Sequence, residues 1–393
     1  MNTHASPTIE LHGIAWGHVR GFGPAHATAA AFTAAHPGIH VAWEVRPLKD
    51  FAGYPVPLLC EQYDLVLFDH PSLGTCVEAG ALLPLDEWLE PEYLADQAEH
   101  SVGPGYESYA WGGHQWGLAV DAAAQVAAYR DDLLRKAGAA VPRSWVDVFA
   151  LAASLPAGRR LGLALRGADA ICTFISISAN IGGPTFWGQA HGIDAEVGDA
   201  AFHLLHRLAP ALHPASFHEY DPGMLDLMAR ADEVVYAPLI FGYSNYARAG
   251  FAPRIIHFAD IPSHDPRPHG SILGGVGLGI STRCAHPREA VAYAAYVASR
   301  EVQCGPYFTS GGQPGHRAAW TDPGINAQCH NFFQGTLRTL DLAYLRPRSA
   351  GYERFQEEAG EIVRRCVIDG RGGRAAVRAL NNLYRTLVGR TPT

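Results

Sequence analysis

Residues 274–281 read GGVGLGIS, with four glycines in the first six positions. A dinucleotide-binding loop has the pattern G-x-G-x-x-G between a strand and a helix, and a phosphate-binding loop ends in Gly-Lys-Ser or Gly-Lys-Thr. Neither pattern fits, because Gly275, Gly277 and Gly279 recur every second residue and no lysine lies nearby. Glycines with a period of two predict a strand that another backbone or a ligand approaches closely, or a segment that takes up backbone rotation.

A second strand-like stretch, WGLAVD at 116–121, separates two sets of α/β elements. The first set alternates strands and helical stretches, a pattern typical of a βαβαβ unit with right-handed crossovers: strands at 8–16, 38–47 and 63–70, and helices at 24–38 and 49–61. The second set includes strands at 160–165, 232–239 and 253–258, and helices at 143–156, 170–181 and 199–208. We therefore predict two lobes, each an open, doubly wound α/β sheet, with 116–121 and 274–281 as hinge strands between them.

Composition and charge limit the classes of function. A chain of 393 residues is too long for one ordinary core, which supports two lobes. The net charge of −8 and the lack of a basic run argue against nucleic acid and anionic membranes as partners. Seven scattered cysteines without a CxxC pair indicate buried, reduced thiols. No apolar stretch is long enough to span a membrane, and a monomer is expected.

Six stretches, in order along the chain, resemble the extracellular solute-binding proteins of ABC importers, specifically the sugar-binding type of family 1. They are FTAAHPGIHVAWE (32–44), YDLVLFDHPSLGTCVEAGALLPLDEWL (63–89), WGLAVDAAAQVAAYRDDLLRKAGAAVPRSWVDVFALAASL (116–155), GGVGLGISTRCAHPREAVAYAAYVAS (274–299), GGQPGHRAAW (311–320) and YLRPRSAGYERFQ (344–356). The chain departs from the family pattern at Tyr129-Arg130-Asp131, where the family has Tyr-Asn-Lys, and in its 20 histidines.

The resemblance implies a two-lobed α/β fold of the type II periplasmic-binding-protein kind, each lobe discontinuous in sequence. Lobe 1 is expected to comprise 1–118 and 279–325, and lobe 2 to comprise 119–278 and 326–393 with the C-terminal helices. The resemblance also implies that a small polar ligand, a sugar or polyol, is held between the lobes and presented to the membrane subunits of an ABC importer. It implies an extracytoplasmic location, whereas the N-terminal sequence as written shows no signal peptide and predicts the cytoplasm.

The residues themselves point to a ligand site in lobe 1. In open α/β sheets, ligands bind beyond the carboxyl ends of the strands. In this lobe those ends carry Trp16, His18, Arg46, Asp69 and His70. An indole ring, a guanidinium group and a carboxylate suit a polyhydroxylated ligand, whose CH faces stack on aromatic rings while its hydroxyls form hydrogen bonds with charged groups.

The remaining predicted ligand-binding residues come from the first hinge and from later segments: Asp121, Trp187, Tyr243, Asn245, Gly274, Gly275 and Arg317. Asp121 ends a largely apolar strand, where a carboxylate is costly unless it is paired. Each position also has a structural interpretation: Trp16 as a core residue, Asp69 as the cap of a turn, and Arg317 as an ion-pair partner between the lobes.

Catalytic residues, a metal and a cofactor are not expected. His203 and His206 lie three residues apart on a predicted helix, but the third ligand that zinc needs is not evident, so they are interpreted as surface histidines. Two other functions stay open on the same fold. One is a cytoplasmic ligand sensor or scavenger, and the other is an enzyme that uses Asp69, His70 or Asp121 as acid or base.

Overall fold

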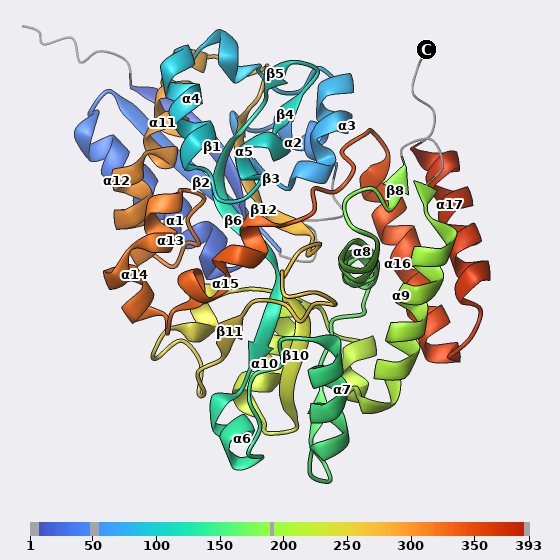
Figure 1. Ribbon diagram of the computed structural model, residues 1–393. Helices are drawn as coiled ribbons and strands as arrows, with labels where there is room; N and C mark the ends of the chain where they lie inside the picture. Colours follow the sequence, from blue (N-terminus) through green and yellow to red (C-terminus); the bar gives the residue numbers. More distant parts are fainter. Residues whose placement is uncertain (1–7, 48–54, 189–191, 389–393) are drawn as a thin grey trace, which may run out of the picture. The chain divides into compact units, whose positions relative to one another are not determined.

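The computed structural model describes residues 8–47, 55–188 and 192–388, and the chain divides into two compact units (Figure 1). Unit 1 comprises Met1–Ala122, Gly275–Ile325 and Arg348–Ala350. Unit 2 comprises Ala123–Gly274, Asn326–Pro347 and Gly351–Thr393. The chain passes from one unit to the other inside two strands, β6 (Leu118–Tyr129) and β12 (Leu273–Ile280).

The sheet of unit 1 has the order β2-β1-β3-β12. Strand β1 runs parallel to β2, from Ile9↔Ile39 to Trp16↔Arg46, and parallel to β3, whereas β12 is antiparallel to β3. The other elements of this unit are β1 (Ile9–Trp16), α1 (Val19–Ala35), β2 (Ile39–Arg46), α2 (Val56–Cys60), β3 (Leu65–Phe68), α3 (Leu73–Glu78), α4 (Pro91–His100), α5 (Gly105–Ser108), β4 (Ala110–Trp111), β5 (His114–Gln115), α11 (Pro287–Ala298), α12 (Arg300–Val302) and α13 (Arg317–Thr321). The alternation of parallel strands and helices predicted for the first 70 residues is confirmed.

Helix α1 begins five residues before the predicted start at residue 24, at Val19. The reason is a side-chain cap, since His18 Nδ1 accepts the backbone amide of Arg20 at 3.1 Å. Of the predicted helix at 49–61, the part up to residue 54 lies outside the described residues, and Val56–Cys60 is helical.

In unit 2, β6 pairs with β10 and β11, and β10 pairs with β7. The elements of this unit are α6 (Asp131–Lys136), α7 (Trp145–Ser154), β7 (Arg160–Leu161), α8 (Ala168–Gly182), β8 (Trp187–Gly188), β9 (Gly192–Ile193), α9 (Ala195–Leu208), α10 (Asp221–Arg230), β10 (Val234–Phe241), β11 (His257–Ala259), α15 (Phe332–Asp341), α16 (Tyr352–Asp369) and α17 (Gly373–Leu387). Helix α14 (Pro323–Gln328) spans a further border between the units, at Ile325 and Asn326.

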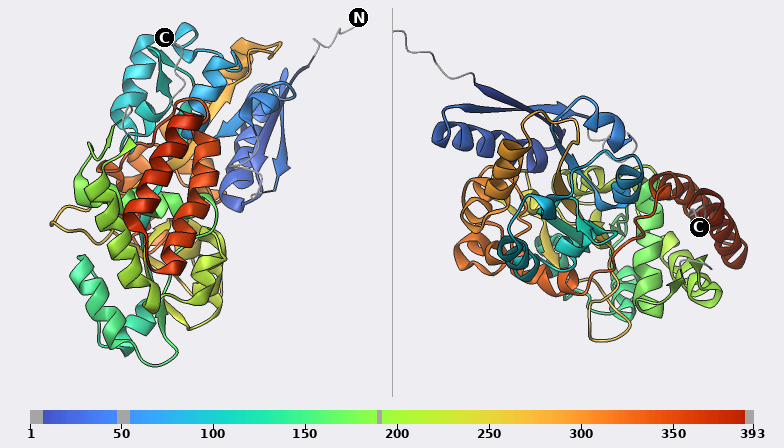
Figure 2. Two further views of the ribbon diagram at one scale, coloured as in Figure 1. Left: turned by 90° about the vertical axis from the view of Figure 1, so that its right-hand side faces the viewer. Right: turned by 90° about the horizontal axis from the view of Figure 1, so that it is seen from above.

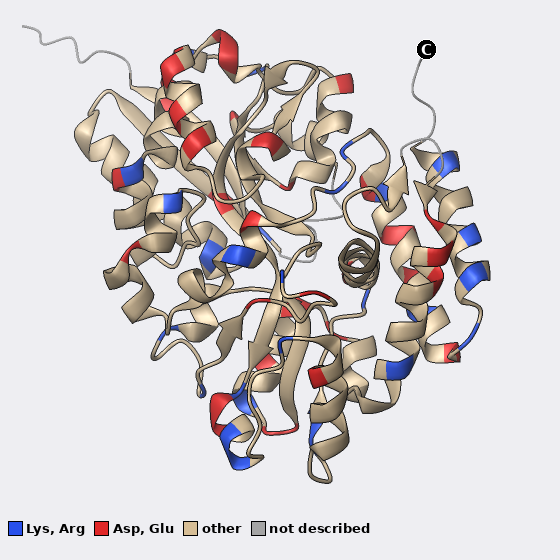
Figure 3. Ribbon diagram, viewed as in Figure 1, with Lys and Arg blue, Asp and Glu red and all other residues tan. Residues whose placement is uncertain are grey.

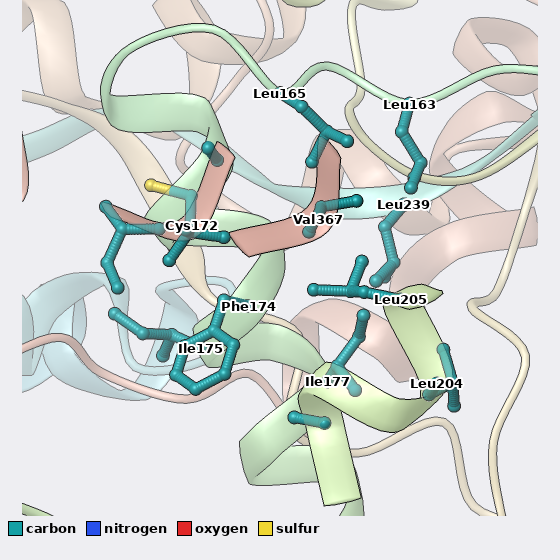
Figure 4. Packing of buried hydrophobic residues seen from close by; sticks show 14 of the residues in the cluster. Leu163, Leu165, Cys172, Phe174, Ile175, Ile177, Leu204, Leu205, Leu239 and Val367 are labelled. Carbon is teal, nitrogen blue, oxygen red and sulfur yellow. The ribbon is translucent and has the colours of Figure 1, made fainter. Parts of the chain in front are cut away.

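Helix α8 lies at the centre of the core of unit 2. Every residue from Ala170 to Asn180 is buried, including polar ones such as Ser176, whose Oγ donates to Gln125 Oε1 at 2.7 Å. Figure 4 shows Ile177 of α8 next to Leu205 of α9, with Leu239 of β10 beside Leu205. The two red helices α16 and α17 lie side by side (Figure 2), and α16 packs on α8. Charged residues are frequent on α16, whereas β12 has none (Figure 3).

Two of the predicted strands have other bounds in the structure. The strand predicted at 116–121 continues well past Asp121, since β6 runs from Leu118 to Tyr129. The strand predicted at 160–165 is only two residues long. After Leu161 the chain turns to another partner, since the amides of Leu163 and Leu165 bond to Ser216. The helix predicted at 143–156 is confirmed as α7, which begins at Trp145 because Ser144 caps it in a capping box with Asp147.

No helix among the described residues is both long enough and apolar enough to cross a membrane. The seven cysteines all lie within the described residues, where none forms a disulfide; six are buried and Cys304 is half-buried.

Candidate functional site

The carboxyl ends of the parallel strands in unit 1 carry most of the predicted ligand residues. Trp16 and Arg46 are register partners at the ends of β1 and β2. Asp69 and His70 directly follow β3, which also pairs with β1. Because parallel strands end at the same edge of a sheet, unit 1 brings these four residues to one edge.

Burial divides these residues into two kinds. The Trp16 ring is 3% exposed and packs under α1, where a Cβ on Gly21 would overlap it. Trp16 is therefore part of the hydrophobic core of unit 1. His70 is fully buried, whereas the neighbouring Asp69 side chain is 28% exposed and its Oδ1 lies 3.0 Å from His70 Nδ1. Asp69 therefore offers a carboxylate to solvent or to a ligand.

Asp121 forms an ion pair with Arg20, a residue that was not predicted from the sequence. Arg20 Nε donates to Asp121 Oδ2 at 2.8 Å and Nη2 donates to Oδ1 at 2.5 Å, and both side chains are buried. Burial raises the pKa of Asp121, the Arg20 guanidinium opposes this rise, and the negative charge of Asp69 adds to it. The Asp69 and Asp121 carboxylates therefore belong to one electrostatic neighbourhood.

His18 belongs to the same neighbourhood. Burial, and then the charge of Arg20, lower the pKa of His18 to about 4, so its imidazole is neutral at physiological pH. Tyr307, also missed from the sequence, is buried, and burial followed by the charge of Asp121 raises the pKa of its hydroxyl. A signal for Arg20 did exist, because a cation in the first turn of a helix opposes the helix dipole and needs a local anion.

The period-two glycines of β12 are positions of close approach. A Cβ on Gly275 would overlap the carbonyl oxygen of Asp121 and lie 3.0 Å from Ala122 Cα, and Gly275 has a φ of +108°. On Gly277 and Gly279 the neighbours would be the rings of Tyr109 and Phe68, both buried. The predicted close approach of another backbone is therefore confirmed at Gly275, and aromatic packing accounts for the other two glycines.

The predicted residues of unit 2 are divided between two places. Tyr243 is half-buried and Asn245 is buried, and both lie in the turn that follows β10. A Cβ on Gly274 would lie 2.6 Å from the ring of Phe241, the last residue of β10, so Gly274 is at the same end of that strand. Trp187 lies elsewhere, packed edge-to-face against Phe355 and Tyr384 in the core of the unit.

Two carboxyl groups that the sequence did not single out lie at this end of unit 2. Asp221 is 4% exposed, accepts the amide of Phe241 at 3.0 Å and shares a hydrogen bond with Asp169. Burial raises the pKa of Asp169 to about 6 and, together with the charge of Asp169, raises that of Asp221 as well. The pair therefore holds a proton under conditions in which an ordinary aspartate is ionised.

The carboxyl pair predicts a pH dependence of stability. Both folded-state pKa values lie above the ordinary value of 3.8, so stability is lost as the pH rises from about 4 through about 6 and beyond. We expect Asp221→Asn to gain stability relative to the wild type by about 1–3 kcal/mol between about pH 4 and pH 8, measured by urea unfolding. Asp265→Asn is the control for sign. Its exposed carboxylate accepts the Arg267 amide, which lowers its pKa, so the opposite and smaller trend is expected. A constant difference between Asp221→Asn and the wild type would contradict the shared proton.

Arg317 lies at the start of α13 in unit 1. It lines a cavity of about 570 Å³ together with residues of α4 and α12, and neither Trp16, Asp69 nor Asp121 is among the residues that line it.

Comparison with known proteins identifies the family. A family model described as "Bacterial extracellular solute-binding protein" matches residues 18–303. A search of curated proteins returned no match. Among solved structures, the maltose-bound MalE3 of T. maritima has a TM-score of 0.81 at 17% identity, covering 97% of this chain and 100% of its own. An ABC transporter solute-binding protein of Agrobacterium radiobacter K84, in complex with ribitol, gives the same four values.

A third structure, the ABC transporter solute-binding protein of Agrobacterium vitis S4 with bound D-mannitol, has a TM-score of 0.76 at 15% identity, covering 96% of this chain and 98% of its own. These matches confirm the predicted α/β fold of the type II periplasmic binding proteins. The matching family is one of solute-binding proteins and not of enzymes. Because its model covers most of the sequence, the chain belongs to the family of bacterial extracellular solute-binding proteins.

Proposed function

We propose that the protein binds a sugar or polyol, without changing it chemically, and presents it to the membrane subunits of an ABC importer. The observation that carries this proposal is the family match over residues 18–303. The ligand class is supported by similar structures, whose printed ligands are maltose, ribitol and D-mannitol. The chemistry of unit 1 agrees with this class, since the partly exposed Asp69 carboxylate can accept hydrogen bonds from hydroxyl groups.

We further propose that residues of both units contribute to the binding of one ligand. From unit 1 the contributing residues are His18, Arg46 and Asp69, and from unit 2 they are Tyr243 and Asn245. A ligand can shift a conformational equilibrium only when it binds one state better than another, and contacts with both units supply that difference. The buried Trp16 and Trp187 have a packing role and are not needed as stacking platforms in this proposal.

The test is isothermal titration of the purified protein with maltose, ribitol and D-mannitol, after native mass spectrometry has identified any copurified molecule. We expect at least one polyhydroxylated compound to bind, and Asp69→Asn to weaken that binding tenfold or more, because a hydrogen bond to a charged group contributes about 1.5–3 kcal/mol. Asp265→Asn, whose carboxylate is held by Arg267 in unit 2, is the matched control and should bind as the wild type does. Equal affinities of Asp69→Asn and the wild type would remove Asp69 from the site.

A further inference from the structure

The cavity of about 570 Å³ in unit 1 has a wall made of possible metal ligands. Asp96 and His100 lie one turn apart on α4, and His316 directly precedes α13. One donor atom from each of these three residues lies within 4.8 Å of the other two. Asp96 Oδ1 is 3.1 Å from His100 Nδ1, and the two imidazole rings are nearly parallel, with centroids 5.4 Å apart.

The backbone holds the two histidines in place. Ser101, next to His100, forms a β-bridge with His316, and the amide of Val102 donates to Gly315 O at 3.2 Å. The amide of Gly315 in turn donates to the buried Gln303 Oε1 at 2.8 Å. These backbone hydrogen bonds join the two segments that carry the histidines. The donor atoms are therefore in place before an ion binds, which lowers the entropic cost of metal binding.

The chemistry of the donors selects a class of ion. Two imidazoles and one carboxylate suit zinc and neighbouring divalent transition metals, and do not suit magnesium or calcium, which prefer oxygen ligands. We propose that Asp96, His100 and His316 form a binding site for a divalent transition-metal ion, zinc first, with a fourth position open to water or to a small ligand in the cavity.

The charges around the donors are balanced. The cavity is lined by two acidic side chains, Asp96 and Glu301. Two arginines, Arg300 and Arg317, also line it, so the numbers of negative and positive side chains are equal. His316 Nδ1 accepts the amide of Ala318 at 3.1 Å. A metal bound at Nδ1 would replace this hydrogen bond, whereas a metal bound at Nε2 would require the proton to leave Nε2.

The test is zinc titration of the full-length protein after removal of metals with a chelator, in competition with a chromogenic zinc indicator. We expect one tight zinc per chain in the wild type, with at least tenfold weaker binding in His100→Ala and in Asp96→Asn. Both substituted positions are at least partly exposed, so the fold is expected to survive. Replacement of zinc by Co²⁺ should give the visible absorption bands of a four-coordinate cobalt site. His100→Ala should lose these bands.

His114→Ala is the matched control, because the His114 ring also pairs with an aspartate of unit 1, Asp86, at 2.9 Å but does not belong to the cluster. It should keep the affinity and stoichiometry of the wild type. If His100→Ala binds zinc as tightly as His114→Ala, the zinc is held by other histidines and the proposal is overturned. A wild type that does not compete with the indicator overturns it equally. Neither result bears on sugar binding, which is measured on metal-free protein.

Discussion

Asp121→Asn is expected to destabilise unit 1 by about 3–5 kcal/mol, because it leaves the charge of Arg20 buried without its counter-charge. The wild-type pair has two short hydrogen bonds and side-chain exposures of 5% and 0%. Asparagine keeps the size of the side chain, so the loss measures charge rather than packing. Urea unfolding followed by tryptophan fluorescence gives the free energy of unfolding.

The matched control is Glu61→Gln, also in unit 1, whose carboxylate lies 3.7 Å from Arg283 with both side chains more than half exposed. Exposed pairs of this kind contribute about 0–1 kcal/mol, so little change is expected. Adding Arg20→Met to Asp121→Asn should recover part of the lost stability, since the uncompensated charge is then gone. If Asp121→Asn costs no more than Glu61→Gln, the interpretation of a buried, mutually dependent pair is wrong.

Gly275→Ala is expected to cost about 2–5 kcal/mol. One part, about 1–2 kcal/mol, is the penalty for an L-residue at positive φ, and the rest is the overlap of the new methyl group with the backbone of Asp121. Because that neighbour is main chain in the adjacent strand β6, it cannot move aside as a side chain can. Thermal and urea unfolding should both report the loss.

Gly113→Ala separates the two parts of this effect. Gly113 has a φ of +87°, and within the described part of the chain nothing lies within 4 Å of the added Cβ. Only the penalty for positive φ, about 1–2 kcal/mol, applies there. Equal losses at positions 113 and 275 would show that β12 and β6 can separate at little cost, contrary to the packing described above.

Local sequence patterns predicted much of the fold. The strands predicted at 38–47 and 63–70 are β2 and β3, whose segments IHVAWEVR and LVLF carry an alternating and a continuous apolar pattern, and the helix predicted at 143–156 is α7. The period-two glycines predicted a strand with a close neighbour, and Asp121 predicted a paired carboxylate. In each case the deciding interaction involves residues near in sequence, or a residue type that tolerates only one kind of surroundings.

The remaining features depend on residues that are distant in the chain. Nothing near Asp121 indicates that its partner is Arg20, and nothing near His100 indicates that His316 lies beside it. His203 and His206 are close in sequence and so stand out as a candidate metal pair, whereas His100 and His316 are more than 200 residues apart and give no local signal. The sequence around a tryptophan at a strand end does not show whether a helix or a ligand will cover its ring. In this structure helix α1 covers Trp16.

The discontinuity of both units has a consequence for synthesis on the ribosome. Strand β12 must emerge before the sheet of unit 1 has its fourth strand, although the first three are made within the first 70 residues. The fold of unit 2 is completed later still. Asn381 of α17 forms hydrogen bonds with both backbone groups of Ile193, and α16 packs on α8. Contacts this remote in sequence form late, so the nascent polypeptide stays incompletely folded until α16 and α17 have been synthesised.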